Sequence, residues 1–397
     1  MDVTRNDIRD YIDGFSVDDQ DSETLKKEIY ELYNVGLMED VAGHEGTNAD
    51  DNTRYVIDLN VDSIVMENTM NQRVYNERKE KLKGLKKLVL PDQRSPEWYE
   101  MRKEKLTASS LASAIGKCHF TTREELLLSK IEDKPYISNP ITEWGVKYED
   151  IAILFYEELY NVKVLDFGLI PHPKFNAFGA SPDGICDDTG NDEYVGRMVE
   201  IKCPPKRKFT KTVPPHYMMQ VQGQLEVCDL DHCDFFQVKL EDYEDYEEYE
   251  KDIFIADENV MPGRTYLNYP KGVTVSYRKK DEIKLTYIYP VLNLSGDEYK
   301  AWIREQKVSI IKEGHEFVES KWWKVSRYEC TLVVRDRSWW TETIEHILRF
   351  YTDLKMYKSS TDKLNELKQQ IGMKKKRNVK VVPIDEFILI SDDEDNQ

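Results

Sequence analysis

Residues 178–202 constrain the fold of this 397-residue chain more than any other stretch. They contain a Ser-Pro-Asp-Gly turn with Asp183 at its third position. Proline restricts one backbone angle and glycine tolerates unusual ones, so the turn holds Asp183 where a strand is expected to begin. The segment therefore predicts a strand with a fixed carboxylate at its start.

An acid-x-lysine triplet follows on a second expected strand. The two-residue period of a strand places Val199 and Ile201 on one face and Glu200 and Lys202 on the other. These two charges form either a surface ion pair or part of a functional site. A third interpretation is chance, because acid-x-lysine triplets are common in acidic chains. If Asp183 lies beside Glu200, repulsion raises one pKa, and a Mg²⁺-like ion held through oxygens relieves it. Lys202 could then orient or activate a water.

Three other segments accompany this pair in a fixed order. A TASS segment at residues 107–110 and a helix with the G-x-x-x-E motif at residues 145–149 precede it, and HYMMQVQ at residues 216–222 follows it. Together they resemble the lambda-exonuclease/YqaJ family of PD-(D/E)xK nucleases, to which the herpesvirus-type alkaline nucleases are similar. The resemblance covers roughly residues 94–240, with a weaker return at residues 328–354.

The resemblance implies an α/β fold with a restriction-endonuclease-like core, in which helices flank a mixed sheet. The residue pattern points the same way, because strands alternate with helices that carry one apolar stripe. The resemblance also implies roles for individual residues. Its metal ligands are Asp183, Glu200, Glu149 and the Ile201 carbonyl, its further catalytic residues are Lys202 and Gln220, and its 5′-phosphate pocket is Arg102, Ser109 and Ser181. The implied cofactor is a pair of Mg²⁺ ions, for which Mn²⁺ is expected to substitute.

The same residues have plainer interpretations when the resemblance is set aside. Ser109 is then a capping or packing serine in a helix expected to begin at Thr107, whose hydroxyl could cap it. Glu149 becomes a surface glutamate. Gln220 belongs to a polar helix face that it shares with Tyr217 and Gln224, since these positions are separated by three and four residues.

Two basic segments are candidates for contacts with a DNA backbone. Lys206, Arg207 and Lys208 lie on a proline-rich loop directly after the triplet. A second run covers residues 78–87. Each has an alternative interpretation as a solvated basic surface.

The net charge of −19 excludes a general polyanion-binding protein, because affinity for phosphates comes from clustered Lys and Arg. Nucleic acid contacts must therefore be local. The six cysteines show no paired spacing, and neither a signal peptide nor a long apolar span is present. These features predict a reducing intracellular compartment and no membrane association. Cys228 and Cys233 beside His232 lack a second matching pair, so buried thiols are expected there rather than zinc ligands.

Composition divides the chain into three expected parts: a helical extension at residues 1–90, a nuclease domain at 91–356 and a tail at 357–397. In the extension we expect a helix over residues 22–37 and a polar loop over 43–53. An insertion at about 241–323 begins with an acidic, tyrosine-rich run and contains a possible hairpin over 273–289. It would form a lid or a partner surface.

The tail carries two short motifs. Residues 374–377, KKKR, resemble a nuclear-import signal or a solubilising end. Residues 387–395 place four apolar residues before acids and resemble a SUMO-interacting motif, which adds a strand to a partner's sheet. Both motifs suit the nucleus or cytoplasm of a eukaryotic cell, including a virus-infected one.

The leading hypothesis is a Mg²⁺-dependent exonuclease that degrades double-stranded DNA 5′→3′ from ends recognised by their 5′-phosphate. It would serve recombination, repair or viral genome processing, with a single-strand-annealing protein and a homo-oligomer as further candidate partners. One alternative is an endonuclease or RNase of the same fold. Another, from a different class, is an inactive nuclease-fold scaffold that binds through its insertion and tail.

Overall fold

The computed structural model describes residues 3–33, 48–132, 139–206, 208–280 and 282–378. The chain divides into two compact units, Met1–Lys83 and Gly84–Gln397. No helix among the described residues is long and apolar enough to cross a membrane.

The first unit is helical and has its own core. It contains α1 (Arg5–Ile12), the 3₁₀ helix η1 (Val17–Asp19), α2 (Ser22–Leu32) and most of α3 (Asn48–Lys86). Its buried cluster is formed by Ile8, Ile12, Leu25, Ile29, Tyr30, Ile57, Val61 and Ile64.

Helix α2 begins at Ser22 as expected, where Asp21 accepts the Thr24 amide, and it ends at Leu32. Residues 34–37 lie outside the described part. The expected loop at 43–53 is wrong for residues 48–53, which already belong to α3. Acidic residues are favourable near the positive end of a helix, so this Asp-rich segment does not prevent helix formation.

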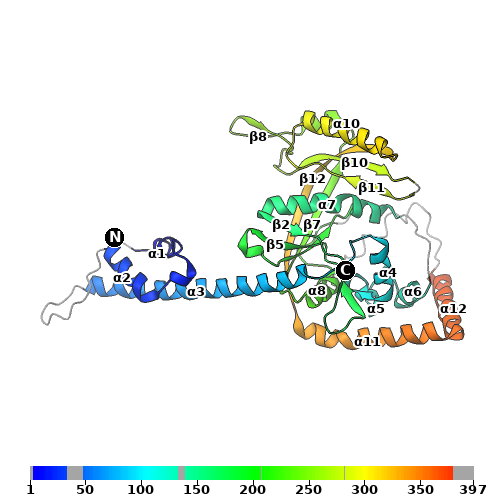
Figure 1. Cartoon of the computed structure of the whole chain (residues 1–397), viewed down its shortest axis with the longest axis horizontal. Helices are drawn as coiled ribbons and strands as arrows, with labels where there is room; N and C mark the ends of the chain where they lie inside the picture. The colour runs from blue at the N-terminus through cyan, green and yellow to red at the C-terminus, as the bar shows by residue number, and fades with distance from the viewer. Residues whose placement is uncertain (1–2, 34–47, 133–138, 207, 281, 379–397) are drawn as a thin grey trace. The chain divides into compact units, whose positions relative to one another are not determined.

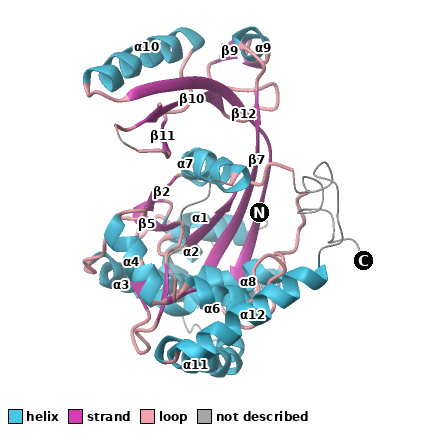
Figure 2. Ribbon diagram, turned by 90° about the vertical axis from the view of Figure 1, so that its right-hand side faces the viewer, coloured by secondary structure: helices cyan, strands magenta, loops and turns pink. Residues whose placement is uncertain are grey.

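The second unit is built on a seven-stranded mixed sheet (Figures 1 and 2). Its order is β11 (Leu285–Ile288), β10 (Lys271–Arg278), β12 (Glu316–Val334), β7 (His232–Asp242), β6 (Met198–Lys202), β5 (Gly184–Gly190) and β2 (Val162–Leu165). Strands β6 and β7 are parallel, while the other neighbours are antiparallel. The prediction of a mixed α/β sheet flanked by helices is confirmed.

Helices cover both faces of this sheet (Figure 1). Helix α7 (Pro140–Tyr160) packs Tyr148, Ile151 and Phe155 into one buried cluster with Val199 and Ile201. Helix α8 (Pro215–Cys228) lies on the opposite face, where it contacts Glu200. The pleat of β6 thus separates its apolar side chains from its acid as expected.

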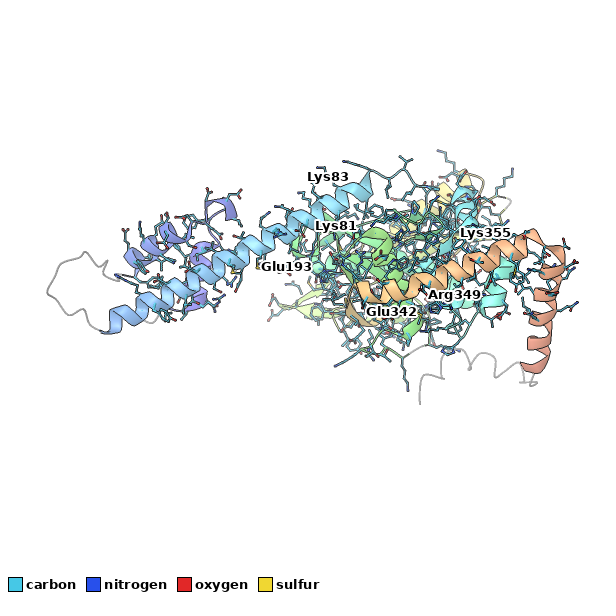
Figure 3. The ribbon with its side chains drawn as sticks, turned by 90° about the horizontal axis from the view of Figure 1, so that it is seen from below. Lys81, Lys83, Glu193, Glu342, Arg349 and Lys355 are labelled. Carbon is cyan, nitrogen blue, oxygen red and sulfur yellow. The ribbon has the colours of Figure 1, made fainter. Side chains whose placement is uncertain are left out.

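Helix α11 (Arg337–Ser359) closes the α8 side of the unit, with Glu342, Arg349 and Lys355 exposed along it (Figure 3). Its buried residues are Thr343, Ile347, Phe350 and Leu354. Leu348 is 47% exposed, whereas Phe350 is fully buried. The helical period places the centre of the apolar face on Ile347 and Phe350, beside Leu348.

The insertion contains the hairpin expected at residues 273–289, formed by β10 and β11. It also contains α9 (Tyr246–Lys251), β8 (Phe254–Ala256), β9 (Asn259–Met261) and α10 (Gly296–Lys312). Aromatic residues of the acidic run are part of its core, which is formed by Tyr243, Tyr249, Val273, Tyr299 and Trp322. Strand β12 runs from this insertion into the main sheet by pairing with both β10 and β7.

Short elements complete the unit. They are α4 (Pro96–Glu104), β1 (Leu106–Thr107), η2 (Ala108–Ser110), α5 (Leu111–Ala114), α6 (Arg123–Ser129), β3 (Ile170–Pro171), β4 (Phe178–Ala180), η3 (Asp192–Tyr194) and α12 (Thr361–Asn378). The KKKR run lies near the end of α12, and the motif at 387–395 lies outside the described residues.

Candidate active site

Asp183 and the triplet meet where β5 and β6 pair. Gly184 of β5 is opposite Val199 of β6, so the preceding residue, Asp183, lies next to the β6 backbone. The Ile201 amide donates to Asp183 Oδ2 at 2.7 Å. The turn and the strand therefore bring Asp183 and the triplet together, although they are far apart in the sequence.

Glu200 is fully buried and has several donors. Lys202 Nζ forms a short ion pair with Glu200 Oε1, and Gln220 Nε2 donates to the same oxygen at 2.6 Å. Gln224 Nε2 donates to Glu200 Oε2 at 2.7 Å. Both amides come from one face of α8, as the spacing predicted. The sequence did not predict the contact between Gln224 and Glu200. The only signal for it was the helix face that Gln224 shares with Gln220.

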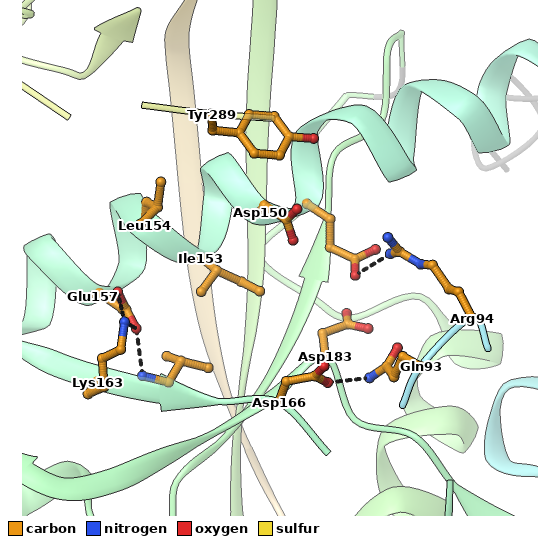
Figure 4. A pocket seen from close by; sticks show the side chains of 12 residues that line it. Gln93, Arg94, Asp150, Ile153, Leu154, Glu157, Lys163, Asp166, Asp183 and Tyr289 are labelled. Atoms are coloured by element: carbon orange, nitrogen blue, oxygen red, sulfur yellow. Dashed lines mark hydrogen bonds and ion pairs between the residues drawn. The ribbon is translucent and has the colours of Figure 1, made fainter. Parts of the chain in front are cut away.

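Glu149 reaches the site from α7. Its Oε1 accepts a hydrogen bond from Arg94 Nη2 at 2.8 Å (Figure 4). Arg94 itself has a φ of 66°, a conformation that non-glycine residues seldom adopt and that tertiary contacts must hold in place. Arg94 was not predicted as a site residue, because it pairs with a residue 55 positions away.

The electrostatics of this cluster are strongly perturbed. Burial raises the pKa of Asp183 well above its usual range, and Glu200 and Glu149 raise it further. Burial also raises the pKa of Glu149, while Arg94 opposes that shift. Burial alone would lower the pKa of Lys202, but Glu200 and Asp183 raise it above its ordinary value. Acids that repel one another in a buried place are a common feature of catalytic and metal sites.

The donor set suits a hard divalent cation, because it consists of carboxylates and the Ile201 carbonyl. Most of these oxygens already have nitrogen partners: Lys202 Nζ, for example, donates to the Ile201 carbonyl at 3.1 Å. Within the described residues, no three His, Cys, Asp or Glu side chains are grouped so that they could hold a metal ion. The chemistry of these residues therefore fits a metal, while their present contacts are with one another.

Two cavities meet at Glu149. One, of about 410 Å³, is lined by Asp183, Gln93, Asp166 and Tyr289 among others (Figure 4). The other, of about 300 Å³, is lined by Lys202, Ile201 and Tyr217. Glu149 lines both, so this carboxylate is reached from two sides, while Asp183 lines the first cavity alone of the two.

The residues expected to hold a 5′-phosphate lie around one tryptophan. The Arg102 guanidinium lies 4.4 Å from the centre of the Trp98 ring and donates to Ser109 Oγ at 3.2 Å. Trp98 Nε1 donates to Ser181 Oγ at 3.1 Å. Arg102, Ser109 and Ser181 thus share one neighbourhood. Trp98 was missed, although its position four residues before Arg102 on α4 could have suggested it.

A second cationic residue, Lys130, lies close enough to Arg102 for the two charges to repel each other. Burial and the neighbouring Arg102 lower the pKa of Lys130 to about 8. Burial likewise lowers the pKa of Arg102. An anion placed beside Arg102 would relieve both shifts, which is a favourable setting for a phosphate.

The expected cap at Thr107 is wrong. Residues 108–110 form the 3₁₀ helix η2, and the Thr107 side chain makes no capping hydrogen bond to its backbone. Thr107 Oγ1 instead lies 3.1 Å from Ser109 Oγ. The hydroxyl therefore helps to position Ser109, since the pairing of β1 with β4 holds Thr107 in an extended conformation.

The two basic segments differ. Lys206 and Lys208 are exposed on the loop after β6, and Arg207 lies outside the described residues. In the other run, Lys86 forms ion pairs with Asp187 and Asp188 of β5. The ammonium of Lys86 is thus engaged by the protein, which favours a structural interpretation of that position.

Comparison with known proteins adds a family to this geometry. Residues 97–231 match the family model of the YqaJ-like viral recombinase domain. This stretch is thus similar to YqaJ-like viral recombinase domains. The match confirms the resemblance over most of residues 94–240 and includes Arg102, Glu149, Asp183 and Lys202.

Viral proteins are among the relatives of the chain. An uncharacterized protein of Acanthamoeba polyphaga mimivirus is 29% identical over 322 residues, which cover 74% of this chain and 58% of that protein. A protein of African swine fever virus (strain Badajoz 1971 Vero-adapted) is 26% identical over 158 residues, or 34% of this chain and 46% of the relative. The chain thus spans about half the length of these relatives.

A solved structure is also similar to the chain. The alkaline exonuclease LHK-Exo from Laribacter hongkongensis gives a TM-score of 0.38 at 20% identity, covering 70% of this chain and 99% of that one.

Proposed function

We propose that this protein is a metal-dependent deoxyribonuclease that degrades duplex DNA 5′→3′ from ends bearing a 5′-phosphate. The observation that carries the proposal is the short connection between two clusters. Ser181 accepts a hydrogen bond from Trp98, which stacks on Arg102, and two residues later Asp183 joins the acidic cluster. One turn therefore links a group suited to a terminal phosphate with a group suited to hydrolysis.

Asp183, Glu200, Glu149 and the Ile201 carbonyl would hold the Mg²⁺ ions. When bound, such ions stabilise charge on the phosphoryl group and make an attacking water more acidic. Lys202 would orient that water through its ammonium group. Gln220 and Gln224 keep the carboxylate of Glu200 in one orientation, because each donates to a different oxygen.

At the other cluster, Arg102 would pair with the terminal phosphate while Ser109 and Ser181 donate their hydroxyls to it. Lys206 and Lys208, with Arg207 between them, would contact the DNA backbone after the triplet. The proposed substrate is double-stranded DNA with free ends. The domain limits, a single-strand-annealing partner, a SUMO-type contact and a homo-oligomer stay predictions, as does the nuclear or cytoplasmic location.

The test is a polarity assay on linear duplex DNA labelled at either end, with and without Mg²⁺. We expect metal-dependent release of nucleotides from the 5′ end, faster for 5′-phosphorylated than for 5′-hydroxyl ends. Lys202→Ala should reduce the rate at least about 100-fold, the lower range of loss for a group that acts in proton transfer. Lys312→Ala, at an exposed position on α10, is the matched control and should leave the rate unchanged.

The same assay separates the alternatives. Cleavage of closed circular duplex would indicate an endonuclease, and equal degradation of RNA would indicate an RNase. Absence of hydrolysis with Mg²⁺ and Mn²⁺ would reject the enzyme and favour the scaffold. Full activity of Lys202→Ala would reject the assigned site while retaining the fold.

A further inference from the structure

Strand β11 of the insertion lies beside the phosphate cluster, which is the group formed by Trp98, Arg102, Ser109 and Ser181. A cavity of about 230 Å³ is lined by Trp98 and Arg102 of α4 and by Lys284 and Tyr287 of the insertion. A neighbouring cavity of about 460 Å³ is lined by Lys284, Tyr287 and Tyr289 together with Arg94. The insertion therefore completes hollows whose other walls belong to the candidate site.

This part of the insertion is anchored to the nuclease core. Tyr289 Oη donates to the Lys147 carbonyl of α7 at 2.7 Å. Strand β11 pairs with β10, and β10 pairs with β12, which also pairs with the core strand β7 (Figure 2). Because both the ladder and the hydrogen bond reach the core, residues 284–289 form a fixed wall rather than a loop joined at one end.

The wall and α4 present aromatic and cationic groups together. Trp98, Tyr99 and Tyr287 line the 230 Å³ cavity with Arg102 and Lys284. Proteins that bind single strands combine stacking on aromatic rings with cations that follow the backbone. Glu143 also lines this cavity, and its negative charge would disfavour a phosphate placed next to it.

We propose that residues 284–289, the hairpin wall, hold the 5′-terminal nucleotides of one DNA strand. Tyr287 stacks on a base near the end, and Lys284 contacts a backbone phosphate. This inference rests on the proposed function, because it requires a nucleic acid end at the Arg102 cluster. It assigns to the insertion a role in substrate binding that its acidic composition did not suggest.

The test measures binding of a short 3′-fluorescein-labelled single strand by fluorescence anisotropy, with EDTA present to prevent hydrolysis. Tyr287→Leu should raise Kd about tenfold, while Tyr287→Phe should stay within about twofold, because phenylalanine retains the stacking ring. Lys284→Ala should reduce the slope of log Kd against log salt by about 0.7, the value for one phosphate contact on a single strand. Lys312→Ala, in the same insertion, should bind as the native chain does.

A comparison of two ends separates the wall from the phosphate cluster. Tyr287→Leu should weaken 5′-phosphorylated and 5′-hydroxyl strands equally, whereas Arg102→Ala should weaken the phosphorylated strand more. If Tyr287→Leu leaves Kd unchanged and Lys284→Ala leaves the salt slope unchanged, residues 284–289 do not bind the strand. This conclusion would hold even if the native chain degrades DNA as proposed. If Tyr287→Leu fails to fold by circular dichroism, the slope of Lys284→Ala decides alone. Absence of hydrolysis by the native chain would instead count against the proposed function.

Discussion

The two strand acids of the site are stabilised to different degrees. Glu200 is fully buried, and it is neutralised by Lys202 and held by the amides of Gln220 and Gln224. Asp183 accepts the Ile201 amide, yet its pKa lies well above the usual range because of burial and repulsion by Glu200 and Glu149. A buried carboxylate with this imbalance destabilises the folded state once it ionises.

Asp183→Asn should therefore stabilise the metal-free protein. The folded pKa of Asp183 exceeds its unfolded value, so its stabilising contribution is fully present below the unfolded pKa and is lost as pH rises through the folded one. At pH 8 the Asn variant should melt about 1 °C higher than the native chain, which corresponds to about 1 kcal/mol for a protein of this size. Thermal unfolding in EDTA measures this.

The same variant should lose the rise in Tm that Mg²⁺ gives the native chain. Glu193→Gln, at an exposed acid in η3, is the control and should keep that rise. A lower Tm for Asp183→Asn in EDTA, with the Mg²⁺ effect retained, would contradict the assigned role of Asp183.

At the scale of elements, local periodicity predicted what lies on one strand or one helix. The alternation along β6 placed Glu200 apart from Val199, and the spacing on α8 placed Gln220 and Gln224 on one face. Such patterns are local, because residues two, three or four positions apart are neighbours in regular structure.

Contacts between elements could not be predicted in this way. Arg94 pairs with Glu149, which lies 55 positions away, and Trp98 forms a hydrogen bond with Ser181, which lies 83 positions away. No periodic pattern encodes such pairs, since they depend on how α4, α7 and the turn before β5 pack. The family resemblance supplied part of this information by indicating Arg102 and Ser181, but it did not include Trp98 or the insertion's Tyr289.

Helix α4 carries Trp98 and Arg102, the two groups on this helix that would contact the end of the substrate. Arg102→Ala should remove most of the preference for 5′-phosphorylated ends, because the charge-assisted contact is lost while the acidic cluster is untouched. We expect kcat/KM for phosphorylated ends to fall about tenfold or more, a loss of about 1.4 kcal/mol in transition-state stabilisation. Initial rates on the two kinds of end measure it.

Lys103→Ala is the neighbouring control on α4. Its rates on both ends should match those of the native chain. If Arg102→Ala still prefers 5′-phosphorylated ends, the assignment of Arg102 to a 5′-phosphate pocket is contradicted.

At the scale of the whole molecule, a net charge of −19 would have to coexist with the proposed polyanionic substrate. Basic groups near the site, such as Arg102, Lys206 and Lys284, would make the contacts, while most of the surface repels DNA. Binding should therefore involve few phosphates, and log K against log salt should have a slope of only about −3 to −5 for duplex DNA. Anisotropy titrations at several salt concentrations give this slope, and a value steeper than about −8 would show a far larger basic surface.

The seven-stranded sheet joins these features into one unit. Strand β12 pairs with β7 in the core and with β10 in the insertion, so the hairpin wall and the core strands belong to one hydrogen-bonded ladder. Movement of the insertion would have to bend this ladder, which favours a substrate path whose walls are formed before binding.

The most direct measurement is anomalous diffraction from a crystal of the protein soaked in Mn²⁺. We expect a manganese peak within coordination distance of carboxylate oxygens of both Asp183 and Glu200, with Lys202 displaced from at least one of its present partners. Density that shows both acids without a manganese ion, in crystals of protein that hydrolyses DNA in Mn²⁺, would contradict it.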